Sequence, residues 1–110
     1  MQKPLTKLKC KACEGLEDRF SKKDIRKYLS FIKGWSLFNN HHIEKVFKFK
    51  DFKTTLAFVN KIGKIAEKED HHPNIDFTYG EATIKLWTHA VHGLSINDFI
   101  LAAKIDELIK

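Results

Sequence analysis

The densest cluster of titratable side chains in this 110-residue sequence is the run from Glu67 to His72, which contains two histidines and three carboxylates. Histidine exchanges protons near neutral pH, and a nearby carboxylate orients its ring. His89 and His92 follow a later predicted strand, and they come close to the cluster if the strands of that hairpin pair. These residue types predict a site for proton transfer by histidine.

The run also allows two other interpretations. It is compatible with an ordinary polar loop, because a second adjacent pair, His41 and His42, falls in a predicted hairpin turn and is interpreted as surface. A metal site is disfavoured because neighbouring residues in an extended segment point in opposite directions, so His71 and His72 do not readily chelate one ion. We therefore expect no metal.

Cys10 and Cys13 form a single C-x-x-C motif. A tetrahedral zinc site needs four ligands, and no second pair of cysteines is present. No βαβ pattern surrounds the motif, so a thioredoxin-type redox role is disfavoured too. We predict a reduced pair without a ligand, with zinc shared between chains or oxidation as the alternatives.

Composition and motifs exclude several classes. The formal net charge is +6, and the excess lies in residues 1–33, which hold 10 basic and 4 acidic side chains. Such charge runs usually solvate a surface, so we predict no nucleic-acid partner. No apolar segment approaches the roughly 20 residues that span a bilayer, and no secretory signal is visible, so we expect a cytoplasmic protein without a membrane partner. Neither G-x-S-x-G nor a glycine-rich phosphate loop occurs.

Hydrophobic spacing and turn residues predict the elements that position the cluster. The spacing predicts helices over about 21–33, 51–69 and 95–109, and strands over 35–38, 43–49, 75–79 and 83–88. Serines followed by aspartates at 21–24 and 95–98 have the form of helix caps. In the middle helix the predicted buried stripe consists of Phe52, Leu56, Val59, Ile62 and Ala66.

This order of elements predicts a two-layer α+β fold. Strands that arrive as hairpins favour an antiparallel sheet, and the amphipathic helices between them pack on one face. We expect residues 1–20 to form a flexible or irregular lead and residues 21–110 to form the domain. In so small a protein, exposed sheet edges are often covered by self-association, so we also expect an oligomer.

Several separated motifs then point to one family. They are the runs Glu67–Pro73, Leu86–His89 and Gly93–Ser95, with Tyr79 and Asp98, and, upstream, Gly34, Trp35 and the run Phe47–Phe52. Together they resemble the pterin-4a-carbinolamine dehydratase family over about residues 21–108. The resemblance implies an α-β-β-α-β-β-α order, a four-stranded antiparallel sheet with three helices on one face, and assembly as a homodimer or homotetramer.

The resemblance also implies a hydro-lyase reaction. A 4a-hydroxytetrahydropterin loses water and becomes the quinonoid dihydropterin, which serves the recycling of a tetrahydrobiopterin-type cofactor. His71 and His89 are then the acid/base pair, and His72 binds and polarises the pterin. Asp98 is then a candidate partner of the histidines that does not itself contact the pterin. No metal or other cofactor is implied. The residues implied to bind or border the pterin are Glu67, Asp70, Pro73, Thr88, Ala90, Val91 and Trp35.

Two other functions stay open at this point. Some animal members of the family are dimerisation partners of a homeodomain transcription factor, so a non-catalytic interaction module is one alternative. A pterin-binding role in molybdopterin-related metabolism is the other. The presence of His71, His72 and His89 favours the enzyme, because a pure scaffold does not require them.

Overall fold

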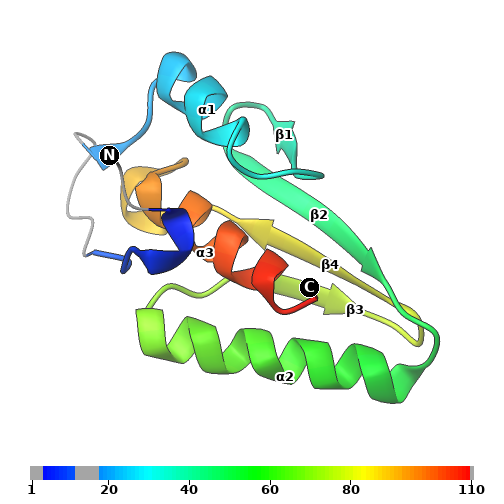
Figure 1. The fold of residues 1–110 in the computed structure, drawn as a ribbon. Coiled ribbons are helices and arrows are strands. Elements are labelled where there is room, and N and C mark those ends of the chain that lie inside the picture. The colour runs from blue at the N-terminus through cyan, green and yellow to red at the C-terminus, as the bar shows by residue number, and fades with distance from the viewer. Residues whose placement is uncertain (1–3, 12–17, 110) are drawn as a thin grey trace.

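Three α-helices and a four-stranded antiparallel sheet make up the protein (Figure 1). The structure is a computed structural model, and it describes residues 4–11 and 18–109. The elements are η1 (Leu5–Lys7), α1 (Lys22–Leu29), β1 (Ser36–Phe38), β2 (His42–Lys48), α2 (Phe52–Glu69), β3 (Asn74–Phe77), β4 (Glu81–Leu86), η3 (His89–Val91) and α3 (Ile96–Glu107). The predicted α+β class, the order of its main elements and the packing of the helices on the sheet are confirmed.

The sheet brings two distant hairpins together at its centre. Its strand order is β1-β2-β4-β3, and every neighbouring pair is antiparallel. Where β2 meets β4, Ile43 lies opposite Leu86, and both side chains are fully buried in the core. One residue outward, the rings of His42 and Trp87 lie 6.1 Å apart. The pairing of β2 with β4 therefore connects the β1–β2 turn to the segment that carries His89.

Polar caps fix where the helices begin. Ser21 with Asp24 at α1, and Ser95 with Asp98 at α3, form reciprocal capping boxes, as their spacing predicts. The Asp51 carboxylate accepts the Thr54 N–H at the start of α2. Since a capping box holds an aspartate at a fixed place in the first turn, the cap of α3 also determines where Asp98 lies.

The buried face of α2 differs from its predicted stripe. Phe52 and Leu56, expected inside, are 46% and 37% exposed. The buried positions are Thr55, Phe58, Ile62, Ala66 and Glu69. Thr55 takes a core position because its hydroxyl lies 2.8 Å and 3.1 Å from the carbonyl oxygens of Asp51 and Tyr79, so its polar atom is satisfied there.

The strand predicted over 75–79 is shorter than expected, because β3 ends at Phe77. The Thr78 N–H donates to the carbonyl of Glu81, which closes the β3–β4 turn and places Tyr79 in that turn with 67% exposure. Likewise β4 ends at Leu86, so Trp87 and Thr88 belong to the connection that follows it.

Residues 4–11, here called the N-terminal segment, pack beside α3 (Figure 1). The Cys10 N–H donates to Glu69 (2.8 Å), the Lys11 N–H donates to Asn97 (2.9 Å), and Lys104 pairs with Glu69 (2.7 Å). Apart from η1 the segment is irregular. Cys13 lies outside the described residues.

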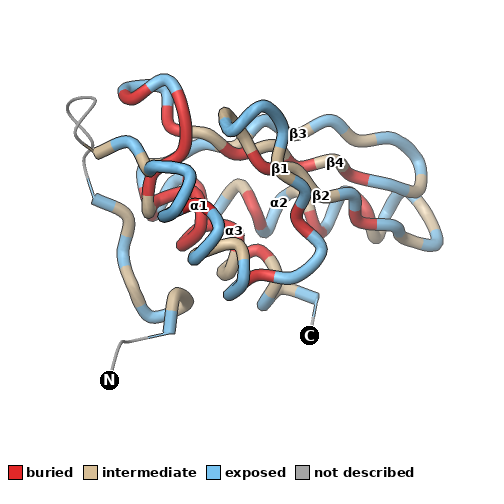
Figure 2. Tube along the Cα trace, turned by 90° about the horizontal axis from the view of Figure 1, so that it is seen from above, coloured by how far each residue is buried: buried red, intermediate tan, exposed pale blue. Residues whose placement is uncertain are grey.

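Burial is concentrated in β4 and α3, as the tube in Figure 2 shows. On α3 it extends around the helix, and even Leu101 and Ala102 are fully buried. The N-terminal segment covers a side of α3 that the sheet and α2 leave open, which explains this breadth. Among the described residues, no helix is both long and apolar enough to cross a membrane.

Candidate active site

The candidate site begins at the C-terminal end of α2. Asp70 caps this helix in the left-handed conformation (φ 53°), and its N–H and that of His71 both donate to the Ala66 carbonyl. Such a residue ends a helix by turning the chain sharply, and Pro73 prevents its continuation. The turn directs His71 away from the axis of α2 and toward the start of α3.

Asp98 receives His71 there. Nε2 of His71 lies 2.7 Å from Oδ1 of Asp98, and the two side chains are 11% and 0% exposed. The other carboxylate oxygen, Oδ2, accepts the Ser95 N–H at 3.0 Å and the Thr88 hydroxyl at 2.8 Å. Asp98 is thus a fully buried carboxylate whose two oxygens join the turn after α2, the segment after β4 and the cap of α3.

Hydrogen-bond directions in this cluster follow from its donors and acceptors. A carboxylate only accepts, so His71 donates through Nε2 and Thr88 donates its hydroxyl hydrogen. The contact of 2.7 Å between the hydroxyls of Thr88 and Ser95 then takes its hydrogen from Ser95. Within the described residues, Nδ1 of His71 has no hydrogen-bond partner in the protein. The arrangement leaves Nδ1 as the ring atom that can exchange a proton with a bound molecule.

His72 and His89 are held more loosely than His71. Nε2 of His72 lies 2.6 Å from Oε2 of Glu67, but the two side chains are 56% and 79% exposed. His89 begins η3, is exposed, and contacts the ring of Trp87 at a centroid distance of 4.8 Å. The Thr88 hydroxyl donates a hydrogen bond to Asp98, which also accepts one from His71. The segment that carries His89 therefore lies beside the turn that carries His71.

The other residues implied to border the pterin differ in how far they are buried. Pro73 is half-buried between His72 and β3, and Ala90 is exposed in η3. Val91 is fully buried and packs inward, and Asp70 is exposed at the end of α2. These four residues belong to the two segments that carry the histidines.

Trp35 is not brought to the histidines. Its indole N–H donates to Asp106 (3.0 Å), and its ring packs in the core against Phe47. Asp106 and Asp98 lie near opposite ends of α3, which separates them by roughly 12 Å at the rise of an α-helix. Asp106 also pairs with Lys45, so Trp35 belongs to a separate cluster.

The β1–β2 turn brings two histidines close to Trp87, although they were expected to be ordinary surface residues. The ring of Trp87 lies 5.5 Å from that of His41 and 6.1 Å from that of His42. Burial, together with the neighbouring His41, holds the pKa of His42 below its ordinary value of 6.5, so its ring is neutral at neutral pH. Only the β2–β4 register could have predicted this contact, because the turn and Trp87 are far apart in sequence.

Fold and site together define a class of protein: a small α+β domain that presents a carboxylate-held histidine beside two exposed ones. The family model for pterin 4 alpha carbinolamine dehydratase matches residues 18–108. A relative from Alkaliphilus metalliredigens is 42% identical over 94% of both chains, and one from Rickettsia canadensis is 43% identical over 96% of this chain and 97% of its own. Both are provisionally named pterin-4-alpha-carbinolamine dehydratases. The chain belongs to this family of hydro-lyases.

Solved structures agree with the assignment. A transcriptional coactivator/pterin dehydratase from Brucella melitensis superposes with a TM-score of 0.80 and 30% identity, over 84% of this chain and 99% of its own. A pterin dehydratase-like protein described as a RuBisCO assembly factor in the alpha-carboxysome gives 0.59 and 25%, over 68% and 88%. The fold is therefore shared by proteins that are described with enzymatic and with non-enzymatic roles.

Proposed function

We propose that this protein removes water from a 4a-hydroxytetrahydropterin and so serves the recycling of a tetrahydrobiopterin-type cofactor. In this reaction the bond between C4a and the hydroxyl oxygen breaks, and the hydroxyl accepts a proton and leaves as water. The proton on N5 passes to a base, and its electron pair forms the N5–C4a double bond of the quinonoid dihydropterin. Atoms and charge balance without an oxidant or a reductant.

The His71–Asp98 pair carries this proposal. Asp98 fixes the ring through Nε2, and Nδ1, which has no partner among the described residues, stays available for the proton transfer that histidine performs. A buried carboxylate also stabilises the imidazolium formed when His71 accepts a proton. His71 and His89 thus act as the acid/base pair, and His72, supported by Glu67, binds and polarises the pterin.

The dehydration rate of freshly generated 4a-hydroxytetrahydropterin, followed by absorbance, tests the proposal. We expect the wild type to accelerate the reaction, and His71→Ala and His89→Ala to lose about 10²- to 10⁴-fold of the rate, the usual contribution of a positioned acid or base. His42→Ala is the matched control, because its ring is held by Phe38 and Glu44. A wild type no faster than buffer would refute the enzymatic role.

A non-catalytic interaction role is the second candidate. The observation that favours it is the structural match to the pterin dehydratase-like protein described as a RuBisCO assembly factor. In that protein the same fold serves an assembly function. The same assay separates the two roles. If neither the wild type nor His71→Ala accelerates the reaction, the interaction role becomes the favoured one.

A further inference from the structure

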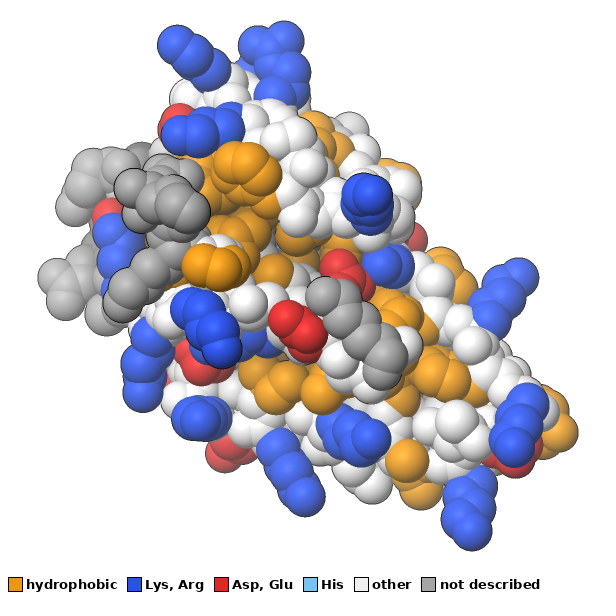
Figure 3. Space-filling model, viewed as in Figure 1, with side chains coloured by type: hydrophobic (Ala, Val, Ile, Leu, Met, Phe, Trp, Pro, Cys, Tyr) orange, Lys and Arg blue, Asp and Glu red, His pale blue; other side chains and the backbone are white. Residues whose placement is uncertain are grey.

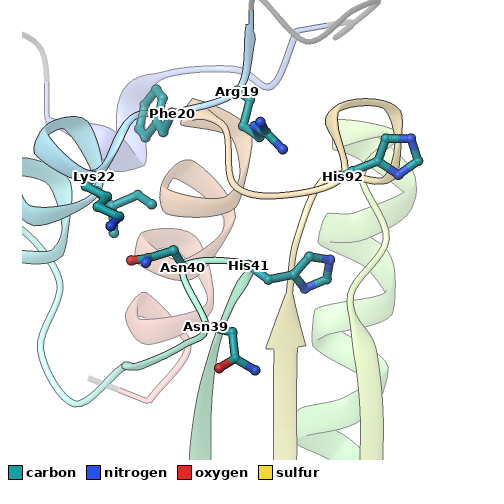
Figure 4. A pocket seen from close by; sticks show the side chains of 8 residues that line it. Arg19, Phe20, Lys22, Asn39, Asn40, His41 and His92 are labelled. Atoms are coloured by element: carbon teal, nitrogen blue, oxygen red, sulfur yellow. The ribbon is translucent and has the colours of Figure 1, made fainter.

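A pocket of about 300 Å³ lies between α1, the β1–β2 turn and the loop after η3. This volume is at the lower end of the range for small-molecule sites. Figure 4 shows that Arg19, His41 and His92 come from three separate segments and surround the space beyond the end of β4. Phe20 and Ile25 give the pocket an apolar side. It is separate from the His71–Asp98 pair, since neither residue lines it.

The polar lining of this pocket is basic or neutral. Arg19 and Lys22 contribute two cations, His41 and His92 two imidazoles, and Asn39 and Asn40 two carboxamides, and no carboxylate of residues 4–11 or 18–109 lines it. Within the described part of the chain, neither cation forms an ion pair. Two cations that line one pocket without a described carboxylate beside them favour an anion.

Among the residues that the structure describes, the acidic residues closest in sequence to Arg19 and Lys22 are engaged elsewhere. Asp18 lies 3.7 Å from Lys11, and the Asp24 carboxylate accepts the N–H of Ser21 in the cap of α1. Neither of these two carboxylates therefore forms an ion pair with Arg19 or Lys22. The aliphatic part of Arg19 is positioned by Gly93, where an added Cβ would lie 2.9 Å from Cδ of Arg19.

The backbone around the pocket is unusual as well. Asn39, Asn40 and His92 have φ values of 52°, 53° and 53°, and they account for three of the four non-glycine residues in the left-handed region within the described ranges. Asparagine adopts this conformation readily at the centre of a hairpin turn, and His92 adopts it where η3 ends. His41 and His92 donate their backbone N–H groups to Phe38 and His89, which holds both turns in place.

Trp87 connects this pocket to the candidate active site. Its ring centroid lies 4.8 Å from that of His89, in the active site, and 5.5 Å from that of His41, in the pocket. A flat ring that lies against Trp87 and His89 is therefore next to His41, which lines the pocket. Trp87 therefore lies between a residue of the candidate active site and a residue of the pocket lining.

We infer that the pocket binds a phosphate group on the side chain of the pterin substrate, with Arg19 and Lys22 as its cationic contacts. This inference rests on the proposed dehydratase function, because it assigns the ring to the surface next to His89. It makes the preferred substrate a pterin with a phosphorylated side chain. Arg19 and Lys22 then determine specificity and take no part in proton transfer.

Binding measurements test this assignment independently of turnover. The ligands are 6-hydroxymethyl-7,8-dihydropterin and its phosphate monoester, measured by fluorescence titration at constant ionic strength. We expect the ester to bind the wild type at least tenfold more tightly than the alcohol. Arg19→Gln and Lys22→Gln should each weaken ester binding about tenfold, the effect of one charged hydrogen bond, and leave the alcohol unchanged. Lys23→Gln is the control, because it removes the same charge from α1 outside the pocket.

Equal affinities for ester and alcohol in the wild type would overturn the inference, as would an equal loss for both ligands in the variants. Inorganic phosphate is the third ligand, and affinity equal to that of the ester would show an independent phosphate site instead. Failure of the proposed function has a different signature. In that case the dehydration assay shows no acceleration, while preferential binding of the ester, lost in Arg19→Gln, still supports the pocket.

Discussion

At the scale of single residues, Asp98 combines two tasks that are usually separate. It closes the capping box of α3 with Ser95, and it holds the imidazole of His71 through its other oxygen. The cap is a local feature that the sequence spacing predicts. The contact with His71 joins residues far apart in the sequence, and local spacing does not predict it. The helix start and the orientation of the candidate acid/base residue therefore depend on one carboxylate.

Replacing Asp98 by asparagine should lower kcat about 10- to 100-fold with a small change in KM, the loss expected for one charged hydrogen bond. The reason is that an amide cannot stabilise a charged imidazolium as a carboxylate does. Nitrogen NMR of the imidazole gives a second readout, since the proton on Nε2 of His71 should no longer be fixed. An unchanged kcat together with an unchanged tautomer would show that Asp98 serves only the cap.

The thiol of Cys10 should be unreactive in the folded protein. Burial, with the nearby Glu69 carboxylate, raises its pKa to about 12 from 9.0, so the reactive thiolate is scarce at neutral pH. The stabilisation from the neutral thiol is complete below pH 9.0 and is lost as the pH rises toward 12. In a Cys13→Ser background, mass spectrometry should find no alkylation of Cys10 by iodoacetamide at pH 8 until urea is added. Fast labelling of the native protein would contradict this placement.

At the scale of elements, the N-terminal segment is the part that sequence patterns describe least well. It has no periodicity, yet its backbone donates to Glu69 and Asn97, which directly precede Asp70 and Asp98. Burial opposes ionisation of Glu69, but the bonds from Lys104 and the Cys10 N–H outweigh it and hold the pKa of Glu69 below its ordinary 4.5. The N-terminal segment is therefore held in place in part by a hydrogen bond to the buried carboxylate of Glu69.

Glu69→Gln should lower the free energy of unfolding at pH 7 by about 1.5–3 kcal/mol, because Lys104 loses its charged partner in a nearly buried place. The depressed pKa gives stability that is complete above about pH 4.5 and is lost as the pH falls through the folded-state value. Urea titrations from pH 3 to 7 should therefore show a smaller pH dependence in the variant. Glu67→Gln, at a highly exposed position, is the control, and identical profiles for the two variants would disprove the role of Glu69.

Local patterns predicted most elements, and the errors have physical causes. Caps and apolar spacing located all three α-helices, and turn residues located both hairpins. The stripe on α2 was misplaced because apolar residues alone were counted, whereas Thr55 is buried with its hydroxyl satisfied and Leu56 remains outside. The site was predicted as a set of residues. The contacts of His71 with Asp98 and of His41 with Trp87 depend on tertiary packing, which local spacing does not determine.

At the scale of the whole molecule, two features bear on self-association. The edge strands β1 and β3 have only three and four residues, which limits pairing through the sheet. On the outside of α2, Phe52 and Leu56 are one helical turn apart and partly exposed. In the view of Figure 3, hydrophobic side chains lie between projecting Lys and Arg side chains. The exposed side of α2 is therefore the stronger candidate for a contact between copies.

We predict a homodimer or homotetramer that uses this side of α2. Light scattering after gel filtration should give a mass above 12.8 kDa for the wild type, and Leu56→Glu should shift the population toward the monomer, because a charge cannot be buried unpaired in an apolar contact. Lys23→Glu, on α1, should leave the mass unchanged. A monomeric wild type would refute the prediction, and an oligomer insensitive to Leu56→Glu would place the contact elsewhere.

The bond between His71 and Asp98 also has a consequence for how the protein is made. The two residues are 27 positions apart, and the contacts of Lys11 with Asn97 span 86 positions. During synthesis from the N-terminus, the histidine emerges well before its carboxylate, and the N-terminal segment gains its contacts with Asn97 only after the start of α3 has emerged. A growing chain that has reached His92 but not Ser95 thus already contains all six histidines and still lacks the carboxylate that orients His71. The orientation of His71 by Asp98 therefore arises only after the start of α3 has emerged, and under the proposed function a chain that lacks α3 should be inactive.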